Sequence, residues 1–268
     1  MGPSEVLKVD TFGGLPGWLI MLIFLVMMAG ASEIGYVWGA RSTVEEKTQY
    51  IFPTVFAAVL AVLGLLLGFT VSMAVTRCDT RRILLLEEAN ALGTDYLRTQ
   101  LLPEPERTEL QNLIRRYVDI RMSYSEGGID AERLRKARAE TEEIQEQMWA
   151  LAVAFAQKDP RSVTGGLVLE SLNNTFDLDT SRWTAFLTHV PESVIYVNAF
   201  IGLLASLMLG YGFGLSRHRH RFSVALLTIS VCAVLGVIID MDRPRSGVIH
   251  VSQWPMIELQ RQLAEPRR

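Results

Sequence analysis

The sequence predicts an all-α integral membrane protein that has four transmembrane helices per subunit and a helical cytoplasmic domain between the second and third of these helices. Two observations support this fold class. Long apolar stretches are grouped in two pairs, at 18–40, 52–76, 194–215 and 222–239. Each approaches or exceeds the roughly 20 apolar residues that carry a helix across about 30 Å of hydrocarbon. Charged residues nevertheless make up 21% of the chain, so we expect a substantial part of it to lie in water.

The chain therefore divides into four parts. Residues 1–76 form an N-terminal transmembrane pair, 77–191 a cytoplasmic helical domain, and 192–240 a C-terminal transmembrane pair. Residues 241–268 form a cytoplasmic tail with a short amphipathic helix. Lys and Arg are slightly more frequent in the flanks on the side of the middle block, where the positive-inside rule places the cytoplasm. Together with the charged, cysteine-poor helices of that block, this distribution favours cytoplasmic termini.

The first stretch is bounded by Trp18 at one end and by Tyr36 and Trp38 at the other, as is typical of aromatic residues at the two membrane interfaces. Glu33 lies near the second boundary. A carboxylate within a membrane segment is a candidate functional group, because burying its charge in lipid is costly. The alternative is that the Glu33 side chain reaches the nearby interface and stays solvated there.

The second stretch carries small residues on one helical face. Their spacing of four, three, four and four keeps them in register: Ala57, Ala61, Gly64, Gly68 and Ser72. Small side chains let two helix backbones approach closely in lipid, and they would also leave room for ions beside a pore. Both interpretations hold if neighbouring subunits repeat the contact around an axis. Larger side chains of this stretch would then ring the neck, and the candidates are Phe56, Leu63, Leu67 and Thr70.

The segment 77–102 has no proline and is expected to extend the second membrane helix into the cytoplasm. Four polar residues mark this extension: Glu87, Glu88, Asn90 and Asp95. They form either an ordinary solvated helix face or the lining of a vestibule in an ion path.

Further helices are expected in the cytoplasmic block. Apolar residues share one face of 106–122, and a heptad seam with alternating three- and four-residue spacing covers 134–155. The seam packs either on 106–122 of the same subunit or on a neighbouring subunit. Another helix covers 163–176, and Thr180 or Ser181 caps a short final one.

The connection between the third and fourth stretches is strongly basic, with Arg217, Arg219 and Arg221 in six residues, 216–221. Repeated around a symmetry axis, these arginines would form a positive collar at one mouth of a pore. The alternative is that they only hold the loop at headgroup level. Just before this loop, glycines at 210, 212 and 214 do not share one helical face, which indicates a loosened or closely packed helix end.

Sequence motifs for catalysis are missing. No phosphate-binding glycine loop with its lysine, no His-Glu-x-x-His and no Cys-x-x-Cys pattern occurs. His218 and His220 are two positions apart, which is a poor spacing for a helical metal site. We therefore expect no enzyme activity, no cofactor and no metal site. The net charge of −3 argues against nucleic acid as a partner, and Cys78 and Cys232 are expected to be free thiols.

Four blocks of the chain carry a family resemblance. They begin at Gly64 (GLLLGFTVSMA), Leu86 (LEEANALGTDYLR), Leu101 (LLP) and Ile239 (IDMDRPRSG). With these blocks the chain resembles the DUF4239 family, a family of bestrophin-like bacterial membrane proteins. Bestrophins are pentameric channels with four membrane helices per subunit and cytoplasmic termini, and their second helices line a hydrophobic neck.

The resemblance implies a homo-oligomer, most simply a pentamer, in the bacterial inner membrane. Its implied partners are further copies of the chain, the lipid bilayer and permeant inorganic ions. The chain departs from the bestrophin pattern in lacking a phenylalanine-rich neck and an acidic calcium clasp, for which Asp240 and Asp242 are the nearest candidates. The alternative for these two carboxylates is helix capping and pairing with Arg243 or Arg245.

The expected function is that of an oligomeric bestrophin-like ion channel. Its ion path would follow the symmetry axis and be lined by the second membrane helix and the cytoplasmic extension of that helix. The alternative is a non-conducting membrane scaffold or stress-signalling module that recruits a partner through its cytoplasmic helices. A water-filled axis favours the channel, whereas a fully packed axis favours the scaffold.

Overall fold

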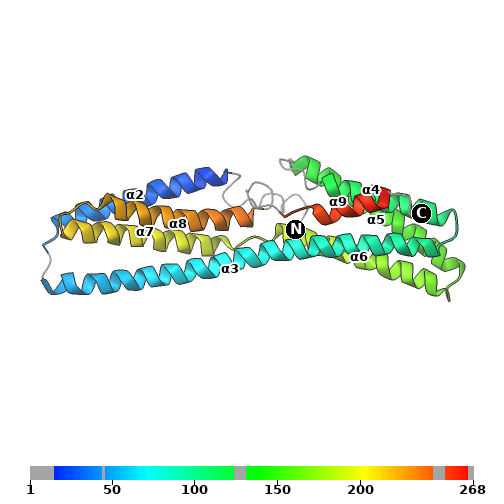
Figure 1. The fold of residues 1–268 in the computed structure, drawn as a ribbon, viewed down its shortest axis with the longest axis horizontal. Helices are drawn as coiled ribbons and strands as arrows, with labels where there is room; N and C mark the ends of the chain where they lie inside the picture. Colours follow the sequence, from blue (N-terminus) through cyan, green and yellow to red (C-terminus); the bar gives the residue numbers. More distant parts are fainter. Residues whose placement is uncertain (1–14, 44–45, 124–130, 244–250, 265–268) are drawn as a thin grey trace. The chain divides into compact units, whose positions relative to one another are not determined.

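The computed structural model of the protein describes residues 15–43, 46–123, 131–243 and 251–264. Within these ranges the regular structure is helical (Figure 1), and the elements are α2 (Gly17–Arg41), α3 (Glu46–Arg98), the 3₁₀ turn η1 (Thr99–Leu101), α4 (Glu106–Ser123), α5 (Ala131–Lys158), α6 (Val163–Leu187), α7 (Glu192–Leu215), α8 (Arg221–Asp242) and α9 (Trp254–Ala264). The predicted all-α fold class is confirmed.

The chain forms two compact units. The first, which we call the membrane unit, contains Met1–Cys78 and His189–His250. It holds the four helices that are long and apolar enough to cross a membrane, which are α2, the first part of α3, α7 and α8. The second, which we call the helical unit, contains Asp79–Thr188 and Val251–Arg268. Helix α3 belongs to both, because it continues past the end of its apolar stretch to Arg98, as predicted.

Glycines bring α2 and α7 into direct backbone contact in the membrane unit. A Cβ atom on Gly35 would overlap the carbonyl oxygen of Leu207, and one on Gly210 would overlap that of Ser32. About one turn further along, the same overlap would arise at Gly39 and Gly214. Apolar surface gains nothing by leaving lipid for another helix, so close packing of this kind is a main source of helix association in membranes.

The three alternate glycines of α7 face two different neighbours. Gly210 and Gly214 lie against α2, whereas a Cβ on Gly212 would lie 2.7 Å from the Phe52 ring of α3. Helix α7 remains regular to Leu215. Of the two interpretations of this glycine pattern, close packing is therefore the correct one.

A polar pair joins α3 to α7 inside the membrane unit. The Asn198 side-chain amide donates to Thr70 Oγ1 at 2.9 Å and to the Val194 carbonyl at 2.8 Å. Thr70 in turn donates to the Leu66 carbonyl at 2.7 Å. Hydrogen bonds between membrane helices typically contribute about 1 kcal/mol. The Asn198 and Thr70 side chains lie within the apolar core of the membrane unit, which includes Met28, Leu63, Leu67, Ala205, Val231, Leu235 and Ile238.

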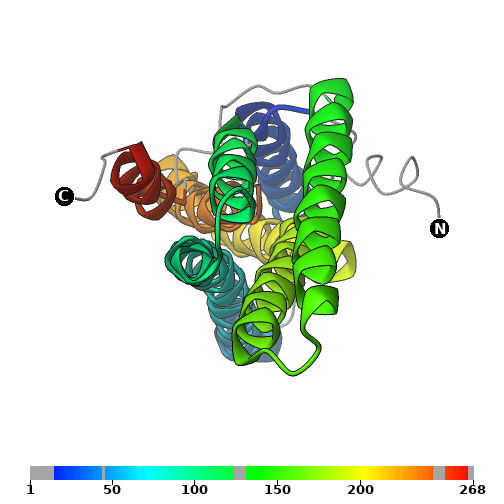
Figure 2. The same ribbon diagram turned by 90° about the vertical axis from the view of Figure 1, so that its right-hand side faces the viewer.

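In the helical unit, α4 packs on α5, α5 on α6 and α9 on α4, and the second part of α3 contributes to the same core (Figure 2). Large buried residues of this core include Leu85, Leu92, Leu110, Ile114, Tyr117, Ile144, Met148, Leu172 and Met256. The α5 seam faces this core, so of the two alternatives for the seam the structure shows packing on the helix of 106–122 in the same subunit.

Two arginines cap helix ends in the helical unit. Buried Arg81 donates to the carbonyls of Ala185 and Thr188 at the end of α6. Arg115 donates to the Leu263 carbonyl at the end of α9. Each guanidinium satisfies carbonyl groups that have no partner within the helix and places a positive charge at the negative end of the helix dipole.

One boundary prediction was wrong. The sequence suggested a helix end at 176 and a new cap at Thr180 or Ser181, but α6 runs unbroken from Val163 to Leu187. The Thr180 hydroxyl donates back to the Phe176 carbonyl four residues earlier, a bond that threonine makes inside helices. It therefore does not cap a new helix.

The glycine contact between α2 and α7 gives a direct test. We expect Gly210→Ala to lower the thermal unfolding temperature of the purified protein in detergent, because the new methyl group would overlap the α2 backbone. Overpacking of this kind costs roughly 1–3 kcal/mol. Gly30→Ala on α2 is the matched control, since a Cβ there has nothing within 4 Å. Equal unfolding temperatures for the two variants would contradict the close α2–α7 contact.

Candidate functional site

The small-residue stripe of α3, which is Ala57, Ala61, Gly64, Gly68 and Ser72, lies on the outside of the subunit. All five residues are exposed. A Cβ on Gly64 or Gly68 would have nothing within 4 Å, in contrast to the glycines of α7. The stripe is thus not used for packing within the subunit and is available to something outside it.

The predicted neck residues lie on the opposite face of α3. Leu63, Leu67 and Thr70 are buried in the core of the membrane unit, and half-buried Phe56 stacks on Phe52 with 6.2 Å between ring centroids. A side chain enclosed by its own subunit cannot also line a path shared by several subunits. The candidate lining within α3 is therefore the exposed small-residue stripe rather than Leu63, Leu67 and Thr70. Sequence spacing could not separate the two faces, because both are apolar.

The four vestibule candidates are also divided between two faces of α3. Glu87 and Asn90 are exposed, whereas Glu88 and Asp95 are fully buried in the helical unit. The exposed pair remains available to line a vestibule. The buried pair has internal partners that give it a structural role.

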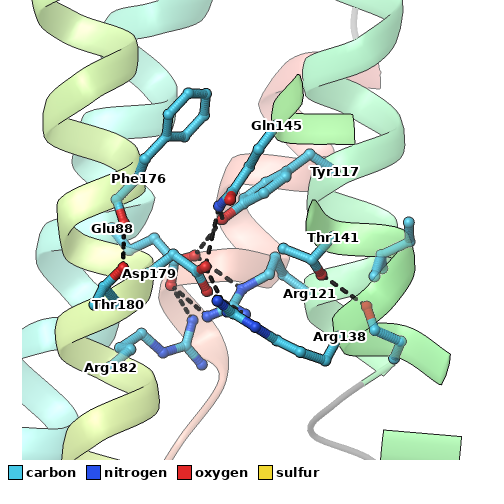
Figure 3. Close-up of polar contacts among 12 residues, drawn as sticks. Glu88, Tyr117, Arg121, Arg138, Thr141, Gln145, Phe176, Asp179, Thr180 and Arg182 are labelled. Atoms are coloured by element: carbon cyan, nitrogen blue, oxygen red, sulfur yellow. Dashed lines mark hydrogen bonds and ion pairs between the residues drawn. The ribbon is translucent and has the colours of Figure 1, made fainter. Parts of the chain in front are cut away.

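Glu88 is the centre of a buried ionic cluster, which we define as Glu88, Arg121, Arg138, Asp179 and Arg182 (Figure 3). Arg121 reaches both oxygens of Glu88, with Nε 2.8 Å from Oε1 and Nη2 3.2 Å from Oε2. Arg182 pairs with Oε2 of the same carboxylate. Two-point contacts between a guanidinium and a carboxylate are among the strongest and most directional ion pairs.

Arg121 connects Glu88 to the second carboxylate of the cluster. Its Nη1 lies 2.8 Å from Asp179 Oδ1, and Arg138 Nη1 lies 2.6 Å from Asp179 Oδ2. Gln145 donates to Asp179 Oδ2 at 3.0 Å. The residues come from α3, α4, α5 and α6, so the cluster ties together the four long helices of the helical unit.

The electrostatics of the cluster keep its acid charged. Burial alone would raise the pKa of Glu88, but the charges and hydrogen bonds of Arg121 and Arg182 outweigh burial and hold this pKa below its ordinary value. Burial raises the pKa of Tyr117 well above its ordinary value. Tyr117 therefore stays a neutral hydroxyl, which donates to Glu88 Oε1 at 3.3 Å.

Asp95 has the opposite electrostatic balance. Its Oδ2 accepts a hydrogen bond of 2.6 Å from the Thr175 hydroxyl of α6. Burial raises the pKa of Asp95 to about 6, against the lowering effects of the hydrogen bonds from Thr175 and Ser171 and of the Arg98 charge. No ion pair to Asp95 is found in the described residues, so burial dominates.

Sequence reasoning missed the other members of the cluster, although a signal was present. Arg121 follows Leu110, Ile114 and Tyr117 at spacings of four, three and four on the buried face of α4. Asp179 extends the buried face of α6 in the same way, after Val168, Leu172 and Thr175. A base on one apolar seam and an acid on another would each be costly to bury alone, so their pairing could have been predicted.

The basic loop is partly neutralised within the membrane unit. Arg219 Nη1 lies 3.0 Å from Glu33 Oε2, and its guanidinium lies 4.3 Å from the centroid of the Tyr36 ring. Glu33 is exposed, which agrees with its placement at the membrane interface rather than within lipid. Arg217 and Arg221 are exposed and make no ion pair with any residue that the structure describes.

Asp242, one of the two acids considered for a calcium clasp, makes contacts with the residues that precede α7. Its Oδ1 accepts the Val190 backbone N–H at 2.8 Å, and its Oδ2 lies 3.3 Å from His189 Nδ1. The described residues contain no group of three or more His, Cys, Asp or Glu side chains arranged to hold a metal ion. Arg245, the other proposed partner, lies outside the described residues.

The ionic cluster predicts unequal effects of two adjacent substitutions. We expect Glu88→Gln to destabilise the protein by roughly 3–5 kcal/mol, because Arg121 and Arg182 would lose a buried counter-charge. The exposed neighbour provides the control, and Glu87→Gln should change stability by less than about 0.5 kcal/mol. Chemical denaturation of both purified variants measures the difference. Similar unfolding midpoints would show that Glu88 does not hold the four helices together.

The raised pKa of Asp95 predicts that replacing it by asparagine stabilises the protein, by an amount that depends on pH. Because the folded state binds this proton more tightly than the unfolded state, stability from Asp95 falls as pH rises from about 4 to about 6. The shift from 3.8 to about 6 corresponds to a loss of up to about 3 kcal/mol at neutral pH. Asp95→Asn should therefore unfold at a higher temperature than the parent at pH 7.5 and at a similar temperature at pH 3.5. A constant difference across this pH range would contradict the assignment.

Comparisons with known proteins agree with this architecture. The family model of the bestrophin-like domain matches residues 21–256. The fold is similar to the crystal structure of a bacterial bestrophin homologue from Klebsiella pneumoniae, with a TM-score of 0.67, 14% sequence identity, and coverage of 91% of this chain and 95% of that one. Two single-residue variants of that homologue give TM-scores of 0.66 and 0.62 at 14% and 15% identity, with coverage of 92% and 91% of this chain and 97% of each of theirs. No curated protein matches the chain in sequence.

The family model covers most of the chain, including nearly all of the four apolar helices and the helical unit except for most of α9. The solved structures independently show the same fold over nearly the same length. The chain therefore belongs to the bestrophin-like family.

Proposed function

We propose that this protein is a bestrophin-type ion channel that assembles as a homo-oligomer, most simply a pentamer. Its ion path follows the symmetry axis and is lined by the small-residue stripe of α3 and the outward face of the helix beyond it. Family membership supports the channel class. The narrower assignment to DUF4239 is part of the same proposal.

The observation that carries this proposal is the free outward face of α3. A stripe of five small residues is exposed although other glycines of the same unit are packed tightly against backbone. Beside the stripe, Leu65 and Phe69 are about 60% exposed. Closed rings are the usual way in which identical subunits enclose a path, and apolar side chains at its narrow part can gate it by excluding water.

The helical unit supports assembly separately. In the membrane unit, exposed apolar residues can contact lipid. Contact with lipid does not explain the exposed apolar residues of the helical unit. There the outward face of α3 still exposes Ile83, Leu86 and Leu97, with exposed fractions of 54%, 48% and 45%. Repeated apolar exposure on one helix face outside lipid is typical of a protein–protein interface. A second copy of α3 or of a neighbouring helix would cover it.

The test is ion flux through purified protein in liposomes, combined with the mass of the assembly. We expect Gly64→Leu and Gly68→Leu to reduce flux by at least about tenfold or to break the oligomer, because the new side chain would occupy the path or the subunit contact. Gly30→Leu introduces the same side chain at another free glycine, on α2, and should leave both flux and assembly unchanged.

Two results would overturn the proposal. If the parent protein forms a stable ring without conducting any inorganic ion, the scaffold or signalling function takes its place. If it conducts and all three leucine variants conduct equally, the ion path does not follow the α3 stripe.

A further inference from the structure

The membrane unit contains a second feature that the channel proposal does not use, a cavity of about 300 Å³ between α2, α7 and α8. Its apolar part is lined by residues such as Leu25, Ala29, Ala225 and Ile229. Its other end is lined by Glu33, Tyr36, His220 and Arg221. A cavity of this size is at the lower limit for an organic ligand, which suits a single narrow chain rather than a bulky group.

The polar end of the cavity favours negative charge. Glu33 neutralises Arg219 through their ion pair, so the charge of Arg221 remains uncompensated by the described residues. Arg221 is also the first residue of α8, whose N-terminal N–H groups donate no hydrogen bond to the side chain of the N-cap residue His220. A helix N-terminus with a free guanidinium beside it is a suitable site for a phosphate group.

A buried hydroxyl in the same cavity points independently to a ligand. Thr228 lies on α8 about two turns below Arg221 and is only 4% exposed. Its Oγ1 has no hydrogen-bond partner in the described structure. An unpaired buried hydroxyl costs about 1–3 kcal/mol in proteins, which is why such groups normally have a partner. An oxygen atom of a bound molecule would supply one.

We propose that this cavity binds one anionic phospholipid per subunit. An acyl chain fills the apolar part, the phosphate lies at the start of α8 beside Arg221, and an ester oxygen accepts a hydrogen bond from Thr228. The arrangement fits the surroundings, because the polar end is lined by Tyr36, a residue of the aromatic belt that the sequence predicts at the membrane interface.

Native mass spectrometry of the full-length oligomer tests this proposal with defined lipids. The probes are phosphatidylglycerol, phosphatidylcholine with the same acyl chains, and inorganic phosphate in detergent without lipid. The parent protein should retain one phosphatidylglycerol per subunit and prefer it over phosphatidylcholine by about tenfold, which corresponds to about 1.4 kcal/mol. Phosphate alone should not be retained, because the acyl chain provides the apolar contact.

Three variants separate the parts of the site. Arg221→Gln should abolish the preference for phosphatidylglycerol while leaving chain binding possible. Thr228→Val, which keeps the shape of the side chain, should weaken retention of both lipids. Ala225→Phe should fill the cavity and remove retention altogether. Arg217→Gln and Ala233→Phe are the controls, since neither residue lines the cavity and both are exposed.

The outcomes are separable from the channel proposal, because lipid retention is measured without ion flux. Equal retention of both lipids by the parent would overturn the anionic site. Unchanged retention by Ala225→Phe would place the lipid elsewhere, and no retention by an intact parent oligomer would overturn the lipid site altogether. If Ala225→Phe fails to assemble, the exposed substitution Arg221→Gln still decides whether the headgroup is recognised here.

Discussion

Helix α3 is the element on which the rest of the structure depends, because this one unbroken helix runs through both the membrane unit and the helical unit. It buries the same face in both units, with Leu63, Leu67, Thr70 and Ala74 in the membrane unit and Leu85, Glu88, Leu92 and Asp95 in the helical unit. The three- and four-residue spacing of this seam continues through both sets. Once this seam is buried, the rotation of α3 about its axis is fixed, and the small-residue stripe lies among its exposed residues. The orientation of the candidate pore lining therefore follows from intramolecular packing.

The parts of this fold that could be predicted are those fixed by a single strong physical requirement. Hydrocarbon thickness determines the length of an apolar helix, so the four spans could be recognised from composition alone. The heptad seam of α5 was equally clear, because an apolar repeat in a charged helix has only one face to bury. In α3 the situation differs, since Leu67 and Gly68 are both acceptable to lipid and to protein. Which of them faces its own subunit depends on α7, where Asn198 selects the Thr70 side, and no pattern local to α3 contains that information.

The charged residues show a related limit. Glu87 and Glu88 are identical in chemistry and adjacent in sequence, yet one is exposed and the other is enclosed by two guanidinium groups. Their different roles arise from the seam: position 88 falls on it and position 87 does not. Replacing buried ion pairs by apolar side chains is often neutral for stability, so the cluster is better explained by specificity. Arg121 bonds to carboxylates from two different helices, and this requirement admits fewer arrangements of α3, α4 and α6 than leucine contacts would.

The membrane unit has two proposed binding surfaces, which are the small-residue stripe of α3 and the cavity between α2, α7 and α8. On α3, the small side chains of the stripe let another subunit approach closely. All residues of the stripe are exposed, so no polar atom of the stripe is buried in the subunit. Between α2, α7 and α8, residues of mixed size line a cavity, and the buried Thr228 hydroxyl makes an empty or purely apolar filling unfavourable. The glycine contact between α2 and α7 connects the two, because it fixes α7 against both α2 and the Phe52 side of α3. Helix α7 therefore lines one side of the cavity, through Gly210 and Phe213, and also carries the contacts against which α3 is oriented.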